Sequence, residues 1–214
     1  MIIEAQNLVK RYGRVYGLKK ASFRVEQGKI TGLLGPNGAG KTTTMRILTT
    51  FLKPTSGEAW VNGHSIFFEG YKIRKEIGYL PEHSPIYPEM TVQEYLHFRA
   101  ALKRVDRKKR KKEVEELMAN FGLSTYAHRL ISELSKGYRQ RVGFCEALLG
   151  YPPLMILDEP TSGMDPLQKN ELLQWIQSLV PDHSILFSSH ILRDVERICS
   201  HVIILNQGEV MAQG

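Results

Sequence analysis

The stretch "GPNGAGKT", residues 35 to 42, combines glycines with a lysine and a threonine in the spacing G-x-x-x-x-G-K-[ST]. Glycines allow successive backbone N–H groups to curl around phosphate oxygens, and a helix that starts here adds partial positive charge. Lys41 supplies a full charge for the β- and γ-phosphates of a nucleotide, and the Thr42 hydroxyl is placed to ligate Mg²⁺. The sequence therefore predicts a nucleotide-binding loop made of Gly35, Pro36, Asn37, Gly38, Ala39, Gly40, Lys41, Thr42 and Thr43.

A second chemical pattern is the carboxylate pair in "LMILDEP", where Asp158 and Glu159 are adjacent. Two neighbouring carboxylates at the end of a strand are costly unless a cation compensates their charge. We therefore expect Asp158 to hold Mg²⁺ and Glu159 to orient and deprotonate an attacking water, the alternative being an exposed acidic turn. The loop alone fits kinases, GTPases and motor ATPases equally, although the guanine-specific pattern N-K-x-D is absent.

These motifs require strands that end beside one another. "KITGLLG" reads as a buried strand that enters the loop, and residues 41–52 read as the helix that follows it. "PPLMILDEP" and "SILFSSH" are apolar strands of the kind that is buried on both faces of a parallel sheet. Strands that alternate with helices predict an α/β fold with a P-loop NTPase core and a mostly parallel sheet. Three earlier runs, "IIEAQNLV", "ASFRVE" and "EAWVNG", predict short antiparallel strands.

Between about residues 84 and 150 the pattern becomes helical. Val114, Leu117, Met118 and Phe121 form one apolar stripe at helical spacing, which is more typical of a core than of a ligand site. We expect a single domain over residues 1–214. Its α/β core and antiparallel subdomain take about residues 1–83 and 151–214, and a helical lobe takes about 84–150.

The stretch "LSKGY", residues 134 to 138, explains how the motifs belong together. With "GPNGAGKT" before it and "LDEPTSGMDP" after it, the chain resembles the ATP-binding cassette (ABC) family over essentially its whole length. In that family this signature opens a helix and binds the γ-phosphate of ATP held by the partner subunit. A serine hydroxyl and a glycine N–H at a helix N-terminus suit this role. The resemblance assigns it to Ser135, Gly137 and Tyr138, although Lys136 and Tyr138 replace the common Gly and Gln.

The resemblance implies roles for further residues. His190 in "SSH" matches a switch histidine that contacts the γ-phosphate, and Asp165 in "SGMD" matches a loop that crosses the dimer. Tyr12 in "KRYG" stands where the family stacks an aromatic ring on adenine. Glu82 replaces a usual Gln, keeps an oxygen that can reach Mg²⁺ and adds a charge. The same substitution occurs in members that resemble bacterial exporter cassettes.

The composition, 42% apolar and 24% charged, is that of an ordinary globular domain. No apolar run approaches the roughly 20 residues that span a membrane, and the first residues do not resemble a signal peptide. We therefore expect a cytoplasmic protein, peripheral on the inner face of the cell membrane, with two reduced thiols. Family members usually continue with more helix after the final "EVMAQG", so a truncated or naturally short form is expected.

The net charge of +7 comes from one run, "KRVDRKKRKK", residues 103 to 112. This run holds eight basic residues and one acidic residue, and the rest of the chain carries 21 of each sign. The run is either a solvated helix face or a contact with anionic lipid headgroups, an acidic partner or nucleic acid. The chain as a whole is therefore no general binder of nucleic acid.

Together these patterns predict the ATP-binding and ATP-hydrolysing subunit of an ABC transporter that depends on Mg²⁺. Two copies, or this chain with a related cassette, would sandwich ATP and drive a separate transmembrane subunit, with export favoured by Glu82. The alternative is a soluble ABC ATPase that acts on nucleic acid or ribosomes. DNA-repair relatives insert long coiled coils into the lobe, and ribosome-associated relatives generally carry two cassettes. Neither feature is present here, so we expect no nucleic-acid partner.

Overall fold

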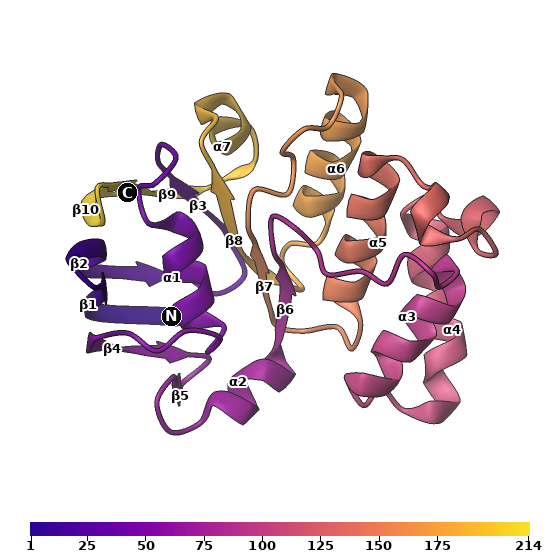
Figure 1. The fold of residues 1–214 in the computed structure, drawn as a ribbon, viewed down its shortest axis with the longest axis horizontal. Helices are drawn as coiled ribbons and strands as arrows, with labels where there is room; N and C mark the ends of the chain where they lie inside the picture. The colour runs from indigo at the N-terminus through magenta and orange to yellow at the C-terminus, as the bar shows by residue number, and fades with distance from the viewer.

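The computed structural model describes residues 1–214 and contains two β-sheets with helices packed around them (Figure 1). The first sheet is antiparallel, with the strand order β2-β1-β4-β5. Its strands are β1 (Ile3–Tyr12), β2 (Val15–Val25), β4 (Ser56–Val61) and β5 (His64–Ser65). The antiparallel strands predicted from the sequence are confirmed.

The second sheet has six strands in the order β10-β9-β3-β8-β7-β6. The five strands from β9 to β6 are parallel to their neighbours, and only β10 is antiparallel. The strands are β3 (Ile30–Leu34), β6 (Ile77–Leu80), β7 (Leu154–Leu157), β8 (Ser184–Ser189), β9 (His201–Asn206) and β10 (Glu209–Gln213). The predicted α/β fold with a mostly parallel sheet is confirmed. Because parallel strands end at the same edge, the segments after β3, β7 and β8 can meet there.

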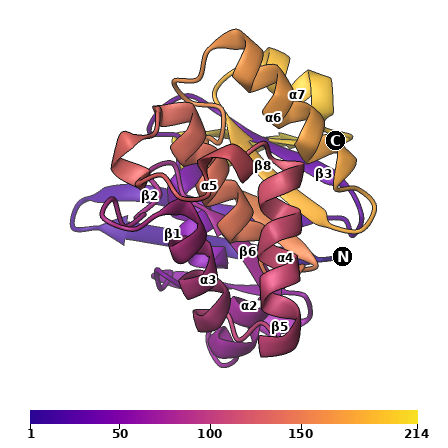
Figure 2. The same cartoon turned by 90° about the vertical axis from the view of Figure 1, so that its right-hand side faces the viewer.

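Seven α-helices connect the strands. Three of them, α3, α4 and α5, lie side by side at one end of the molecule (Figure 1, Figure 2). The helices are α1 (Lys41–Leu48), α2 (Gly70–Glu76), α3 (Val92–Leu102), α4 (Arg107–Asn120), α5 (Lys136–Leu148), α6 (Pro166–Ser178) and α7 (Leu192–Ile198). Two short 3₁₀ turns, Ser124–Tyr126 and Ile131–Glu133, lie between α4 and α5.

The helix expected over residues 41–52 is shorter in the structure. It ends at Leu48, and the backbone at Thr50 turns into the left-handed region with φ of 61°. The Thr49 hydroxyl donates to the Arg46 carbonyl at 3.2 Å, so side-chain bonding competes with a further helical turn. The correction shortens the helix by one turn and leaves its start at Lys41 unchanged.

Two hydrophobic cores flank the parallel sheet. One core, of 29 buried residues, joins a sheet face to α3, α4, α5 and α6, and includes the predicted stripe on α4. The other, of 23 buried residues, lies between the two sheets and α1. Strand β7 shows the division directly, since Leu154 and Ile156 belong to the second core while Met155 and Leu157 belong to the first. The strand is therefore buried on both faces, as its composition predicts.

Candidate active site

The loop of residues 35–43 connects β3 to α1 through backbone conformations that require glycine. Gly38 and Gly40 have φ of 78° and 107°, in the left-handed region that other residues rarely adopt. A Cβ atom at Gly35 would lie 2.2 Å from the carbonyl oxygen of Leu205, and one at Gly40 would lie 2.5 Å from that of Gly17. The glycines therefore allow β2 and β9 to close around the loop, and α1 begins directly after it.

Lys41 is almost fully buried and its ammonium group is held inside the loop. Nζ donates to the carbonyl oxygens of Gly35 at 2.7 Å and Pro36 at 3.2 Å. It also lies 3.2 Å from Oε1 of Glu159, which is equally buried. A cation and a carboxylate that are far apart in the sequence thus meet at the edge of the sheet.

Glu159 is positioned by an unusual backbone conformation. Its φ is 49°, a left-handed value that costs a residue with a side chain on the order of 1–3 kcal/mol. Its N–H donates to the Ser188 hydroxyl at 2.8 Å, which fixes the turn after β7. Nδ1 of His190 lies 2.9 Å from Oε2, so the carboxylate has Lys41 on one side and a histidine on the other.

Asp158 is fully buried beside this group. Oδ1 accepts from the Ser188 hydroxyl at 2.8 Å, whereas Oδ2 is buried without a hydrogen-bond partner. Burial raises the pKa of the Asp158 carboxyl, and the charges of Glu82 and Glu159 raise it further, against lowering by the Ser188 and Thr42 hydroxyls. A negative group in such surroundings is suited to a cation.

The donor set around Asp158 fits Mg²⁺ better than a metal that needs a protein cage. No group of three or more His, Cys, Asp and Glu side chains gathers to hold a metal. Mg²⁺ characteristically takes one or two carboxylates and completes its shell with water and phosphate oxygens. The unpaired Oδ2 of Asp158, the adjacent Thr42 hydroxyl and the nearby charge of exposed Glu82 match that requirement.

Ser188 is a site residue that the sequence analysis missed. Its hydroxyl bridges the two carboxylate residues, since it accepts from Glu159 N and donates to Asp158. Leu157 pairs with Phe187 in the parallel register of β7 and β8, which puts Ser188 next to Asp158. The pair of serines that ends β8, directly before His190, is the only signal that could have revealed it.

Tyr12 lies at the end of β1, close to the start of α1. A Cβ atom at Gly17 would lie 2.9 Å from the Tyr12 ring and 3.3 Å from the Thr43 hydroxyl, so these two side chains flank the same glycine. The ring is about half exposed, with the Lys10 ammonium 5.3 Å from its centroid. An exposed aromatic face therefore stands beside the nucleotide-binding loop.

Ser135 and its neighbours lie in a different setting. Ser135 is exposed and caps α5, accepting from the Tyr138 N–H at 3.4 Å. Gly137 is buried, and a Cβ atom there would lie 1.8 Å from Oε1 of Gln168. The Tyr138 ring packs on Tyr126 with centroids 4.3 Å apart. No hydrogen bond or ion pair joins this helix start to the loop of residues 35–43.

Asp165 caps the neighbouring helix α6. One carboxylate oxygen accepts from the N–H groups of Leu167 and Gln168 at 3.0 Å. The preceding loop lies against the start of α5, since a Cβ atom at Gly163 would lie 2.2 Å from the Lys136 ammonium. Asp165 and Ser135 thus belong to two helix starts that touch each other.

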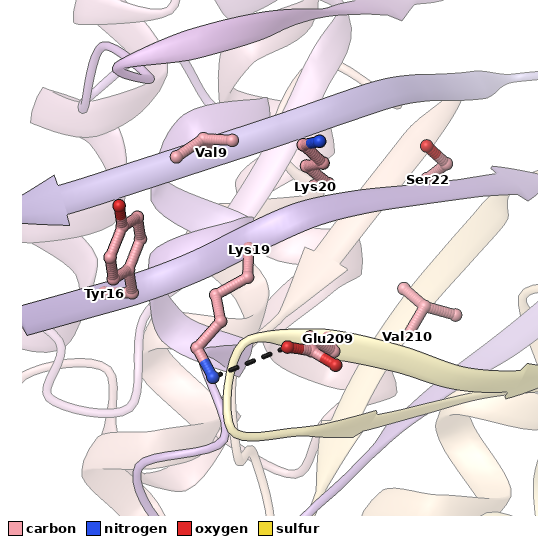
Figure 3. A pocket seen from close by; sticks show the side chains of 7 residues that line it. All are labelled: Val9, Tyr16, Lys19, Lys20, Ser22, Glu209 and Val210. Carbon is pink, nitrogen blue, oxygen red and sulfur yellow. Dashed lines mark ion pairs between the residues drawn. The ribbon is translucent and has the colours of Figure 1, made fainter.

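A cavity of about 650 Å³ lies elsewhere, between β1 and β2 and the start of β10 (Figure 3). Lys19 and Glu209 face each other across it at 3.5 Å. Its other lining residues are Val9, Tyr16, Lys20, Ser22 and Val210, none of which belongs to a sequence motif. We therefore place the candidate active site at the loop of residues 35–43 and not in this cavity.

Comparison with known protein families shows which family this chain belongs to. The sequence model of the family described as "ABC transporter" matches residues 18–162, which is more than half of the chain. The chain belongs to the ABC transporter family. The family predicted from the sequence motifs is confirmed. The interpretation of the loop as part of a kinase or a GTPase is therefore set aside.

Curated relatives of this ABC cassette align over nearly the whole chain. The ABC transporter ATP-binding protein YxlF of Bacillus subtilis is 38% identical over all of this chain and 70% of its own length. The bacitracin transport ATP-binding protein BcrA of Bacillus licheniformis is 38% identical over 99% of this chain and 69% of its length. The linearmycin resistance ATP-binding protein LnrL of Bacillus subtilis is 34% identical, with coverage of 100% and 69%.

Solved structures agree with the fold. An ATP-binding subunit of an ABC transporter has a TM-score of 0.90 at 31% identity, covering all of this chain and 90% of that one. A dimeric cassette in a post-hydrolysis state, bound to ADP and Pi, has a TM-score of 0.90 at 25% identity, with coverage of 99% and 97%. The chain is therefore the ATP-binding, ATP-hydrolysing cassette of an ABC transporter. None of its own helices is long and apolar enough to cross a membrane.

Proposed function

We propose that this cassette hydrolyses ATP at Glu159 to power export through a separate transmembrane subunit. The observation that carries the catalytic part is the convergence of Lys41, Glu159 and His190 at the end of β7. The names of the bacitracin transport and linearmycin resistance relatives support export. The exposed Glu82, in place of the family's usual glutamine, supports the same direction.

Each residue has a distinct task in hydrolysis. The loop of residues 35–43 and Lys41 bind the phosphates, and Tyr12 stacks on the adenine. Glu159 accepts the proton of the attacking water, and His190 orients that carboxylate through its 2.9 Å contact. Lys41 shares an ion pair with Glu159, so a phosphate that engages the ammonium frees the carboxylate to act as a base.

Mg²⁺ is held by Thr42, Asp158 and Glu82 in this proposal. The ion supplies charge neutralisation at the phosphates. The chain contributes the buried Asp158 carboxylate, whose Oδ2 has no partner within the protein, and Ser188 fixes the direction in which that carboxylate points. Glu82 stands on the loop after β6 and adds its charge from the solvent side.

The helix start at Ser135 completes the site of a second cassette. Ser135 is exposed, and the N-terminus of α5 offers a hydroxyl and backbone N–H groups to an anion. It makes no hydrogen bond or ion pair with its own loop of residues 35–43, and a solved cassette of the same fold is dimeric. In the ATP-bound dimer Ser135, Gly137 and Tyr138 therefore meet the γ-phosphate on the partner, and the loop of Asp165 crosses between the subunits.

The transmembrane subunit docks in a groove beside the Glu82 loop. This cavity of about 560 Å³ separates α1 and β6 from α3 and α5. Its walls include Phe51, which is 78% exposed, and Leu102, which is 58% exposed. Apolar side chains on the rim of a polar groove are typical of a docking surface for another protein. Docking there makes the cassette peripheral on the inner face of the membrane.

The groove also lies where the two parts of the single domain meet, so it can couple their movements. The α/β core and antiparallel subdomain, about residues 1–83 and 151–214, carry the phosphate loop, whereas the helical lobe, about 84–150, carries Ser135. The docking groove lies at their boundary, so a rotation of the lobe that moves Ser135 toward a partner also changes the groove. No nucleic-acid partner is needed for this cycle.

A mixed dimer tests the proposal. A Lys41→Ala chain keeps an intact Ser135 helix, and a Ser135→Arg chain keeps an intact loop of residues 35–43. In a slowly hydrolysing Glu159→Gln background, ATP and Mg²⁺ should trap one ATP in the mixed dimer and none in either parent dimer. A Ser135→Arg homodimer that occludes ATP normally would show that the phosphate site is complete within one chain, and the proposed dimer would be wrong.

A further inference from the structure

A second groove, of about 490 Å³, lies between α2, the turn that joins α3 to α4, and the segment that joins α5 to β7. It opens near the beginning of β6 and β7, whereas the nucleotide loop and the catalytic carboxylates follow the ends of β3 and β7. Two acidic residues line it, Asp106 and Glu113. Five basic residues line it, namely Arg74, Lys75, Lys103, Arg104 and Lys109, and we call it the basic groove.

The basic groove keeps an excess of positive charge, because five basic residues and only two acidic residues line it. None of its five basic side chains forms an ion pair, although other basic residues of the chain do. Its two carboxylates are engaged by the backbone. Asp106 accepts from the Lys108 N–H at 2.8 Å, and Glu113 accepts from the Gly150 N–H at 2.5 Å. A concave surface with unpaired cations attracts anions.

Lys103 is built into the wall of the basic groove. Its ammonium donates to the carbonyl oxygens of Glu146 at 2.6 Å and Ala147 at 3.0 Å, at the C-terminal end of α5. Burial lowers the pKa of Lys103 to about 8. An anion in the groove would favour the charged form of this lysine. The next residue, Arg104, has φ of 60°, a strained value that persists only where the surroundings impose it.

Aromatic and apolar side chains border the same surface. The Tyr71 ring has the Lys75 ammonium 4.5 Å and the Arg104 guanidinium 5.8 Å from its centroid. Tyr71 and Tyr151 are each more than half exposed although they line the groove. Basic residues interleaved with exposed tyrosines are typical of protein surfaces at the headgroup level of a membrane.

The unpaired positive charge continues only into the start of α4, where Arg107, Lys108, Lys109 and Arg110 form no ion pair. Further along the helix, Lys111 lies 3.9 Å from Glu115 and Lys112 lies 3.6 Å from Glu116. A nucleic acid requires a track of cations that follows several phosphates. The compact basic groove fits one small anionic group better than a long polyanion.

We propose that the basic groove binds the phosphate of an anionic phospholipid headgroup. This inference rests on the proposed function, because the basic groove shares Arg74, Ile77, Leu102 and Lys103 with the groove assigned to the transmembrane subunit. A chain docked there presents both grooves on the side that faces the bilayer. Lys75, Arg104 and Lys109 then contact the lipid phosphate, while Tyr71 lies at the headgroup level.

Vesicle binding by the whole chain tests this proposal. Wild-type protein should sediment with vesicles of phosphatidylcholine that contain phosphatidylglycerol, and not with vesicles of phosphatidylcholine alone. The variant Lys75→Gln/Arg104→Gln/Lys109→Gln should bind the anionic vesicles about tenfold more weakly or worse, because each basic residue near a membrane surface contributes substantially. The matched control Lys108→Gln/Lys111→Gln/Lys112→Gln removes the same charge outside the groove and should lose about threefold or less.

Several results would overturn the proposal. Equal losses in the two variants would mean diffuse attraction by net charge, and no sedimentation of the wild type would exclude lipid binding. Groove-dependent binding of inorganic phosphate without vesicle binding would point to a soluble anion, and groove-dependent binding of duplex DNA would point to nucleic acid. ATP hydrolysis and the mixed-dimer trapping are measured on the same variants without lipid. If these succeed while vesicle binding fails, only the lipid site is wrong.

Discussion

The loop of residues 35–43 and the helix start at Ser135 are the two proposed phosphate-binding regions, yet the rest of the chain encloses only the first of them. Around Lys41 the charged groups are enclosed: the ammonium, Glu159 and Asp158 are buried and contact residues from three strand ends. Ser135 is exposed, and its hydroxyl contacts only the N–H of Tyr138 in its own helix. The first region is a preorganised half-site, and the second is a surface whose use depends on another molecule.

Removing the proposed base should have the largest effect. Glu159→Gln should lower ATP hydrolysis by about 10²–10⁴, since general-base removal typically costs that much, while ATP binding is retained. Turnover and equilibrium nucleotide binding are the two measurements. Normal turnover in this variant would show that the enclosed region does not contain the base.

Removing the buried ammonium group of Lys41 should weaken the binding of ATP. Lys41→Ala should raise the Kd for ATP by tenfold or more, because a charge-assisted contact to phosphate is worth about 1.5–3 kcal/mol. Ser135→Arg in the same titration of monomer should leave the Kd nearly unchanged. If both variants weaken monomer binding equally, the two regions are one site and the comparison fails.

Gly137 allows a sharper test of the exposed region. Gly137→Ala should lower hydrolysis, because the new Cβ would lie 1.8 Å from Oε1 of Gln168 and must displace that side chain beside the helix start. The loss of stability should be small, since this amide is the end of a flexible side chain. Gln168→Ala should restore much of the loss, since it removes the colliding atoms. Thermal unfolding and ATPase rate on the two single variants and the double variant give the answer. No recovery in the double variant would mean that the Gly137 backbone itself is required.

Neutralising Asp158 should raise the stability of the fold while it lowers ATP hydrolysis. The folded-state pKa of this carboxyl is raised, mainly by burial, so its charge destabilises the fold increasingly as pH rises above the ordinary carboxyl range. Asp158→Asn should therefore raise the Tm at neutral pH, by roughly 2–4 °C for each kcal/mol gained, and abolish efficient hydrolysis. The gain in Tm should shrink in acid, and a lower Tm at neutral pH would contradict this account.

The smallest effect is expected at Glu82. Glu82→Gln should keep ATPase activity within about tenfold, because shape and one oxygen acceptor survive, while the Mg²⁺ requirement shifts upward. A titration of activity against Mg²⁺ measures both quantities. Activity that is lost even at saturating Mg²⁺ would show that the negative charge itself is needed.

Much of the fold follows from local patterns in the sequence. The strands β3, β7 and β8 and the start of α1 were predictable because apolar runs lead directly into glycine or acidic motifs. The segments α2 (Gly70–Glu76) and β6 (Ile77–Leu80) were missed, because a four-residue strand is too short to show a period. Its place at the edge of the sheet comes from pairing with β7, which is a contact distant in sequence.

The candidate site was predictable in its chemistry but not in its supports. Lys41 and Glu159 are marked by motifs, whereas Ser188 gains its role only from the register of β8 beside β7. The sequence analysis also placed Lys103 in a basic run, whereas in the structure its ammonium is buried against the end of α5. Burial of a single lysine depends on tertiary packing, which no local pattern reveals.

Helix α5 links three features described above, namely Ser135, the Glu82 loop and Lys103. It is 13 residues long, about 20 Å, with Ser135 at its first turn and the carbonyls that hold Lys103 at its last. Midway, Gly143 packs so closely that a Cβ atom would lie 2.7 Å from Ser84, on the loop that carries Glu82. The helix therefore connects the proposed partner site to the wall of the two grooves and contacts the Glu82 loop midway. If a partner's nucleotide displaces the first turn of α5, as we propose, we expect the far end of the helix and the wall shared by the two grooves to move with it.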